Sequence, residues 1–160
     1  MARTLTLADI AQLAILKGKE IIPSFVCILD YEEKDAFSEE GWFSRLKDGK
    51  RVTLTLHSWG QCQFLGKDGC EVHSSRPWMC RIFPFWFNPM PEIRDSSRRY
   101  CESLKKRPNP GIDPELLRMA LLKDGDETLQ FFEKVSGKFE IEGFVEAVVD
   151  EVERKMNNKP

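Results

Sequence analysis

Hydrophobic residues near the start of the chain recur with the spacing of an α-helix. Those that fall on one helical face are Leu7, Ile10, Leu13 and Ala14. Thr6 and Asp9 have the spacing of a capping box, in which each side chain accepts a hydrogen bond from the other residue's backbone N–H. Gly18 follows the last apolar position and can end the helix. The pattern therefore predicts a helix between Thr6 and Gly18.

A second helix is predicted to begin near Pro23, inside the apolar run IIPSFVCILDYEEKDAF of residues 21–37. Cys27 lies within this run, far in sequence from the other cysteines. Because a free cysteine behaves as a small hydrophobic residue, we expect Cys27 in the core.

The middle of the chain has the alternation of β-strands. Residues 51–58 (RVTLTLHS) alternate β-favouring and polar residues, and two shorter runs, 62–65 and 70–73, lie on either side of the turn sequence GKDG. Together these segments predict a small antiparallel sheet.

A short helix is expected over residues 76–83 (RPWMCRIF), with Ser74 or Ser75 as its cap, Pro77 in its first turn and Pro84 after its end. Residues 88–107 contain several prolines and basic side chains. We expect a loop there, with a short helix around Cys101.

The last third of the chain reads as helical after a boundary at RPNPG, residues 107–111. Three helices are predicted over residues 114–123, 127–135 and 141–156, with Gly125 and Gly137 ending the first two. The fold class is therefore expected to be α+β: two amino-terminal helices, a short antiparallel sheet, a loop-rich cysteine site and three carboxy-terminal helices. We expect a cysteine-cluster domain over residues 1–107 and a helical extension over 108–160 that packs on it.

The charge balance of the chain limits the kinds of partner that we expect. The 160 residues include 24 Lys and Arg against 26 Asp and Glu, a net charge of −2. A general nucleic-acid binder would have a basic excess, so we expect no nucleic-acid partner. No apolar run is long enough to span a membrane, and the first residues lack the apolar core of a signal peptide, so we expect a cytoplasmic protein.

Four of the five cysteines lie between residues 62 and 101, with the spacing Cys62-x7-Cys70-x9-Cys80-x20-Cys101. In a reducing compartment, clustered thiols favour metal binding or redox chemistry over structural disulfides. The cluster has no Cys-x-x-Cys pair, which structural zinc sites commonly contain, so the spacing alone is only moderately specific. We expect the turn to bring Cys62 and Cys70 to one side, with Cys80 on the following helix and Cys101 closing a four-thiolate metal site.

Cationic and aromatic residues surround the predicted ligands. Arg76 and Arg81 lie in the same segment as Cys80 and can offset the negative charge of a thiolate site, so we expect them beside the bound cofactor. The nearby aromatic residues are Trp78, Phe83, Phe85, Trp86 and Phe87. They can shield such a site from water, and they can equally pack as ordinary core residues.

The string RP-x-x-CR-x-FP, together with the upstream cysteines, resembles the signature of the YkgJ-like cysteine-cluster family of zinc- or iron-chelating domains. The residues that match the signature are Cys62, Phe64, Leu65, Cys70, Arg76, Pro77, Cys80, Arg81, Phe83 and Pro84. The opening LTLADIAQLA also resembles the start of the family's first helix, so the resemblance covers residues 4–101. It implies a metal-binding function.

One element of the family is missing. Its members usually have a segment of the type C-x-x-C-G-x-C-C immediately before the first helix, whereas this sequence begins at Met1 without one. Either the four remaining cysteines complete one site, or a partner supplies further ligands, or metal binding has been lost. Retention of Cys101 favours the first alternative, since it brings the count to four.

The kind of metal stays open between zinc and a 4Fe-4S cluster, because four sulfurs satisfy both. The wide spacing and the aromatic residues favour the cluster. His57 and His73 are substitute ligands in principle, although a lone histidine beside a strand is more commonly an ordinary surface or core residue.

Two other functions remain open. In a thiol-dependent enzyme, one cysteine would be a nucleophile activated by His73 or by Arg76 and Arg81. In an accessory subunit, a protein partner or larger complex would dock on the acidic last helix or on the basic segment from Arg94 to Arg107, and the metal site would be structural or lost. Both charged segments are equally explained as solvated faces.

Overall fold

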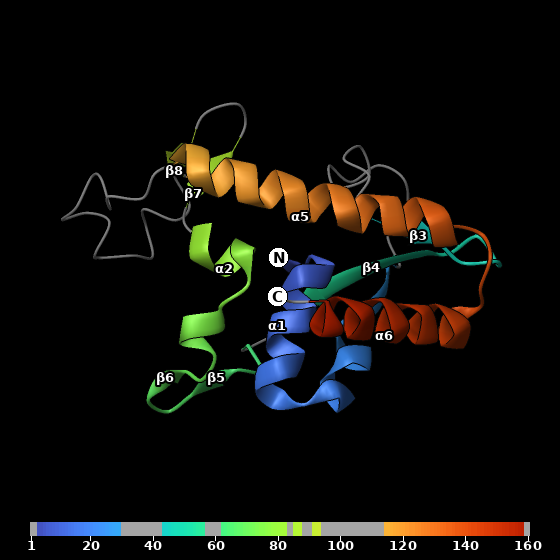
Figure 1. The fold of residues 1–160 in the computed structure, drawn as a ribbon, viewed down its shortest axis with the longest axis horizontal. Coiled ribbons are helices and arrows are strands. Elements are labelled where there is room, and N and C mark those ends of the chain that lie inside the picture. Colours follow the sequence, from blue (N-terminus) through green and yellow to red (C-terminus); the bar gives the residue numbers. More distant parts are fainter. Residues whose placement is uncertain are drawn as a thin grey trace.

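The structure, a computed structural model of the chain, describes residues 3–29, 43–56, 62–82, 85–87, 91–93 and 114–158. Figure 1 shows an α+β fold, as predicted, in which long helices lie against a small sheet. The helices are α1 (Leu7–Lys17), α2 (Trp78–Ile82), α5 (Pro114–Val135) and α6 (Ile141–Asn157), with 3-10 helices η1 (Lys19–Phe25) and η2 (His73–Ser75). The strands are β1 (Arg3–Thr4), β2 (Val26–Leu29), β3 (Ser44–Arg45), β4 (Arg51–Leu56), β5 (Leu65–Gly66), β6 (Gly69–Cys70), β7 (Phe85–Phe87) and β8 (Pro91–Ile93).

The main sheet is built around β4. Strand β2 pairs with it along one edge, and β1 and β3 pair with the two ends of its other edge, all antiparallel. Residues 52–56 of β4 are all buried, so this strand lies inside the fold. The prediction is confirmed over Arg51–Leu56, and residues 57 and 58 lie outside the described ranges.

Helix α1 begins and ends as predicted. Asp9 N donates to Thr6 Oγ1 and Thr6 N donates to Asp9 Oδ2, both at 3.0 Å, which completes the capping box. Gly18 follows the last turn with a φ of 99°, a conformation that side chains with a Cβ rarely adopt. The apolar face of α1 is buried in the core.

The predicted second helix is wrong where the structure describes it. Residues 19–25 form η1 with Pro23 inside it, and Val26–Leu29 then form β2. Val26 and Ile28 are β-branched, and β4 offers a full ladder of backbone partners from Leu54 to Arg51. Pairing with that distant strand outweighs the local helical pattern. Residues 30–37 of the predicted helix lie outside the described ranges.

Cys27 occupies β2, which ends the strand order in the described part of the chain. Its side chain is half-buried and faces Thr53 in the register, so the expectation of a fully buried core cysteine is wrong. Among the described strands β2 has a neighbour on one side only, which agrees with the partial burial of its residues.

Two helices follow residue 113 in place of the three predicted. Helix α5 runs through Gly125 without a break, although glycine in a helix interior costs about 1 kcal/mol relative to alanine. Gly125 is buried, and Thr128 Oγ1 donates to the Asp124 carbonyl at 2.9 Å across the position where the helix was expected to end. Packing of α5 therefore outweighs the local stop signal, whereas Gly137, with a φ of 72°, does lie after its end.

The hydrophobic core lies between the sheet and helices α1, α5 and α6. Three phenylalanine rings, those of Phe131, Phe132 and Phe144, lie 6.2–6.4 Å apart at its centre. The predicted apolar stripe of the last helix is confirmed, because Phe144, Val148 and Val152 are fully buried. The boundary expected at residue 107 lies outside the described ranges, and the two-domain division stays a prediction.

None of the helices in the described residues is long and apolar enough to cross a membrane.

Candidate metal centre

Cys62 and Cys70 flank a tight hairpin formed by β5 and β6. Leu65 pairs with Cys70 and Gly66 with Gly69, and Leu65 N donates to the Cys62 carbonyl at 2.9 Å. Gly69 has a φ of 113°, which only glycine adopts without strain. The predicted turn is confirmed, but its strands are two residues long and form a separate sheet from that of β4.

Two buried side chains anchor this hairpin to the core. Phe64 and Val72 are 7% and 1% exposed, and the Phe64 ring lies 6.4 Å from that of Phe25. Glu71 also pairs with Lys17 of α1 at 2.8 Å. The hairpin is thereby held beside the end of α1 (Figure 1), with Cys62 and Cys70 half-buried against the core.

Cys80 lies on α2, whose start differs from the prediction. The Pro77 carbonyl accepts hydrogen bonds from Cys80 N at 2.9 Å and Arg81 N at 3.1 Å, so Pro77 is the first acceptor of the helix. Ser74 and Ser75 belong to the preceding η2 and do not cap α2. The expected ending at Pro84 lies outside the described residues.

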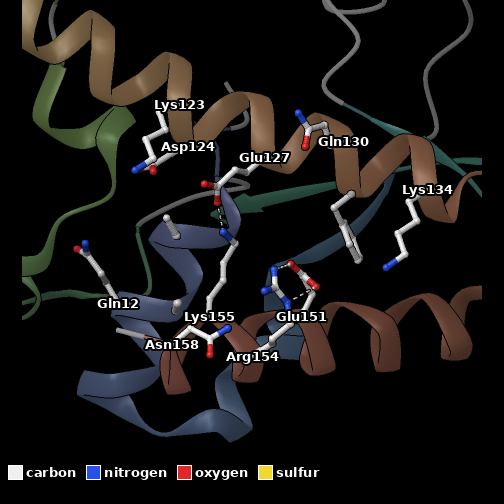
Figure 2. A pocket seen from close by; sticks show the side chains of 13 residues that line it. Gln12, Lys123, Asp124, Glu127, Gln130, Lys134, Glu151, Arg154, Lys155 and Asn158 are labelled. Atoms are coloured by element: carbon white, nitrogen blue, oxygen red, sulfur yellow. Dashed lines mark hydrogen bonds and ion pairs between the residues drawn. The ribbon is translucent and has the colours of Figure 1, made fainter. Parts of the chain in front are cut away.

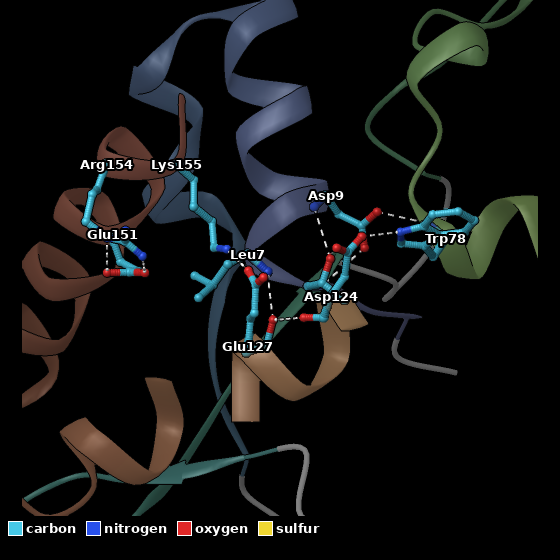
Figure 3. A network of polar contacts seen from close by, with 10 residues as sticks. Leu7, Asp9, Trp78, Asp124, Glu127, Glu151, Arg154 and Lys155 are labelled. Carbon is cyan, nitrogen blue, oxygen red and sulfur yellow. Dashed lines mark hydrogen bonds and ion pairs between the residues drawn. The ribbon is translucent and has the colours of Figure 1, made fainter. Parts of the chain in front are cut away.

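Helix α2 is docked on two other helices through Trp78 (Figure 3). Its backbone N donates to Asp9 Oδ1 of α1 at 2.9 Å, and its indole Nε1 donates to Asp124 Oδ2 of α5 at 2.7 Å. The network continues at Thr128, which donates to the Asp124 carbonyl and accepts from Leu7 N at 3.0 Å. Two carboxylates and one hydroxyl thus join the beginnings of α1 and α2 to the middle of α5.

Asp9 is a buried carboxyl, 5% exposed. Burial raises its pKa above the ordinary value of 3.8, because the charged form loses hydration. The hydrogen bonds with Thr6 and Trp78 lower the pKa, the negative charge of Asp124 raises it, and the net effect is a raised pKa.

The two predicted cationic residues brace the segment that contains Cys80. Arg81 Nε donates to the Arg76 carbonyl at 2.6 Å, its NH2 reaches Gln12 Oε1 of α1 at 3.5 Å, and its guanidinium lies 5.2 Å from the centre of the Trp78 ring. Arg76 Nε donates to the His73 carbonyl at 3.2 Å. These contacts hold the loop and helix together, and the expected place of both arginines beside a cofactor stays a prediction.

The described part of the chain includes three of the four predicted ligands. Cys62, Cys70 and Cys80 are thiols rather than disulfides, all half-buried against one core. In these residues no three His, Cys, Asp or Glu side chains are gathered closely enough to hold a metal ion. Cys101 lies outside the described residues, so the four-cysteine set stays a prediction. The donor chemistry fits, because thiolates are preferred ligands of zinc and of iron–sulfur clusters.

The other predicted site residues lie on other elements than these cysteines or outside the described residues. His73 is an exposed residue of η2, and His57 and Phe83 lie outside the described residues. Residues 91–93, within the loop expected over 88–107, form β8, which pairs with β7 over residues 85–87. The short β8 was missed because Pro91 obscures its pattern. The aromatic shield stays a prediction.

An open groove of about 600 Å³ lies between α1, α5 and α6 (Figure 2). Lys155 of α6 forms an ion pair with Glu127 of α5 across it, and Arg154 pairs with Glu151 within α6. Among the described residues its lining contains no cysteine or histidine, which separates it from Cys62, Cys70 and Cys80. Gln12 and Asp124 line the groove and also contact α2.

These features define a small α+β protein with a cysteine-bearing hairpin followed by a short, docked cysteine-bearing helix. A family model named CxxCxxCC, described as a "Putative zinc- or iron-chelating domain", matches residues 25–109, more than half of the chain. The chain belongs to this family, as its resemblance to the YkgJ-like signature predicts, and the matched range includes all five cysteines. No curated protein and no solved structure matches the chain.

Sequence reasoning missed the residues that dock α2. The capping-box pattern identifies Asp9 as a partner of Thr6, but nothing in the sequence links it to Trp78, 69 residues away. The sequence offered one indication, the polar groups of Asp124 and Trp78, which need hydrogen-bond partners when they are buried.

Proposed function

We propose that the protein binds zinc or iron through the thiolates of Cys62, Cys70, Cys80 and Cys101. The observation that carries this proposal is that three thiols outside disulfides, at the β5–β6 hairpin and on α2, all pack against one core within the matched family range. Four thiolates satisfy either a tetrahedral zinc ion or a 4Fe-4S cluster.

The cluster is our first candidate and zinc the alternative. The ligands are widely spaced and come from separate segments, which suits a cluster because it is larger than a single ion. When bound, a 4Fe-4S cluster supplies one-electron transfer, and zinc supplies a structural cross-link without redox chemistry. In either case the chain's own residues hold the thiols: Phe64 and Val72 anchor the hairpin, and Trp78 anchors α2.

Metal analysis of the full chain purified without oxygen tests the proposal. We expect either iron with inorganic sulfide and a broad visible absorbance, or stoichiometric zinc. Cys80→Ser should abolish or strongly reduce metal content. Cys27→Ser is the matched control, because Cys27 is also half-buried but lies on β2, and it should retain the metal. A folded, metal-free wild-type chain whose thiols all react with a thiol reagent would overturn the proposal.

The accessory-subunit function stays a prediction, and the last helix offers limited support for it. Two of its acidic residues are paired within the chain: Glu151 with Arg154, and Glu153 with Lys19 at 2.9 Å. That agrees with a solvated, internally paired face. Glu142, Glu146 and Asp150 are exposed, and the basic segment from residue 94 lies outside the described residues.

A further inference from the structure

Trp78 is held at two points by two different helices. Its backbone N–H is bound by Asp9 of α1 and its indole N–H by Asp124 of α5, at 2.9 and 2.7 Å. Cys80 follows two residues later on the same short helix. The position of Trp78 therefore sets the position of Cys80.

We infer that Asp9 and Asp124 are positioning residues of the metal site, which place Cys80 by holding Trp78. This inference rests on the proposed function, in which Cys80 is a ligand. Neither carboxylate contacts the metal in this scheme. Both act through α2, in the way that residues behind a metal ligand commonly fix its orientation.

The length of α2 supports this role. A helix of five residues has almost no stability of its own, because forming the first turn costs more conformational entropy than one hydrogen bond returns. Its existence therefore depends on tertiary contacts. In the described residues, the hydrogen bonds from α2 to other helices come from Trp78 and Arg81. The two Trp78 bonds, at 2.9 and 2.7 Å, are shorter than the Arg81 bond at 3.5 Å.

Two attachment points on one residue also fix its orientation. A single hydrogen bond would leave α2 free to rotate about it, whereas bonds at the backbone and at the far end of the indole define both its position and its direction (Figure 3). The guanidinium of Arg81 also stacks on the Trp78 ring, 5.2 Å from its centre, which adds a third contact to this side chain. Cys80, two residues further along the same helix, is thereby held in place relative to α1 and α5.

Zinc affinity of the full chain, measured by competition with a chelator, tests this inference. Zn²⁺ is the probe because thiolates bind it without a redox step. We expect Trp78→Phe and Asp124→Ala to weaken zinc binding by roughly 10-fold, the lower end of the range for groups that hydrogen-bond a metal ligand directly, because they act on Cys80 only through α2. Asp124→Asn keeps an oxygen that can accept from the indole, so it should recover most of the affinity.

A matched control separates positioning from general stability. Val148→Ala removes buried volume on α6, which takes no part in the Trp78 hydrogen bonds. It should lower the melting temperature at least as much as Trp78→Phe while leaving zinc affinity unchanged.

The outcomes distinguish the two proposals. A wild-type chain that binds neither zinc nor iron overturns the proposed function and, with it, this inference. A wild-type chain that binds zinc, with Trp78→Phe and Asp124→Ala binding equally well, overturns the positioning role alone. The positioning role is also overturned when Val148→Ala loses as much affinity as they do, since affinity would then follow overall stability.

Discussion

Asp9 accepts a hydrogen bond from the backbone N–H of Trp78 at 2.9 Å, although 69 residues separate them in the sequence. The same carboxylate accepts from Thr6 N at the start of α1. One side chain thus satisfies backbone donors at the beginnings of two helices, the second of which contains Cys80. Amino-terminal N–H groups of helices lack partners within the helix, which explains the value of a buried carboxylate there.

The buried Asp9 predicts a specific pH dependence of stability. Its pKa is raised in the folded state, mainly by burial, so folding favours the protonated carboxyl. The stability it contributes is fully present below its unfolded pKa of about 4 and is lost as the pH rises through the higher folded pKa. Relative to Asp9→Asn, which does not titrate, the wild-type free energy of unfolding should fall as the pH rises above about 4 and through the raised folded-state pKa.

Urea unfolding of the two proteins across this range provides the measurement. Val148→Ala, which removes no titrating group, is the control and should show a nearly constant difference from the wild type. A wild-type protein that gains stability over Asp9→Asn with rising pH would contradict the expectation.

Thr128 should be needed for its hydroxyl rather than its shape. The side chain is fully buried, accepts from Leu7 N at 3.0 Å and donates to the Asp124 carbonyl at 2.9 Å. Thr128→Val keeps the volume but leaves both backbone groups without this partner, so the free energy of unfolding should fall by about 1–3 kcal/mol. Thr128→Ser retains the hydroxyl and should lose less. Equal stability of the Val and wild-type proteins in denaturant would show that the hydroxyl is dispensable.

Two glycines allow backbone strain to be separated from effects on the cysteine site. Gly69 and Gly49 have φ values of 113° and 87°, and a Cβ added at either would meet nothing within 4 Å. Alanine at either position should therefore cost a similar amount, on the order of 1–3 kcal/mol, through strain alone. Only Gly69 lies in the hairpin between Cys62 and Cys70, so only Gly69→Ala should also reduce metal content.

Thermal unfolding and metal analysis of both variants test this expectation. Metal loss in Gly49→Ala to the same degree as in Gly69→Ala would mean that the hairpin has no particular role.

The features that could be predicted from the sequence are those encoded by neighbouring residues. Helix α1 has its own capping box, α6 has an apolar stripe with acids opposite, and the turn between β5 and β6 has a glycine where the backbone requires one. The family could be recognised for the same reason, because RP-x-x-CR-x-FP is a local string. Each of these signals depends on residues a few positions apart.

The features that were missed depend on residues far apart in the sequence. Val26–Leu29 became β2 because β4 supplied hydrogen-bond partners, and α5 continued through Gly125 because burial outweighed the flexibility of glycine. The docking of Trp78 between Asp9 and Asp124 has no local signature at all. Local sequence determines which backbone conformations have a low free energy. Burial and hydrogen bonding between distant segments determine which of these conformations is adopted. The cysteines that are candidate ligands could therefore be found from the sequence alone. The contacts that hold α2, and with it Cys80, depend on how helices far apart in the sequence pack together.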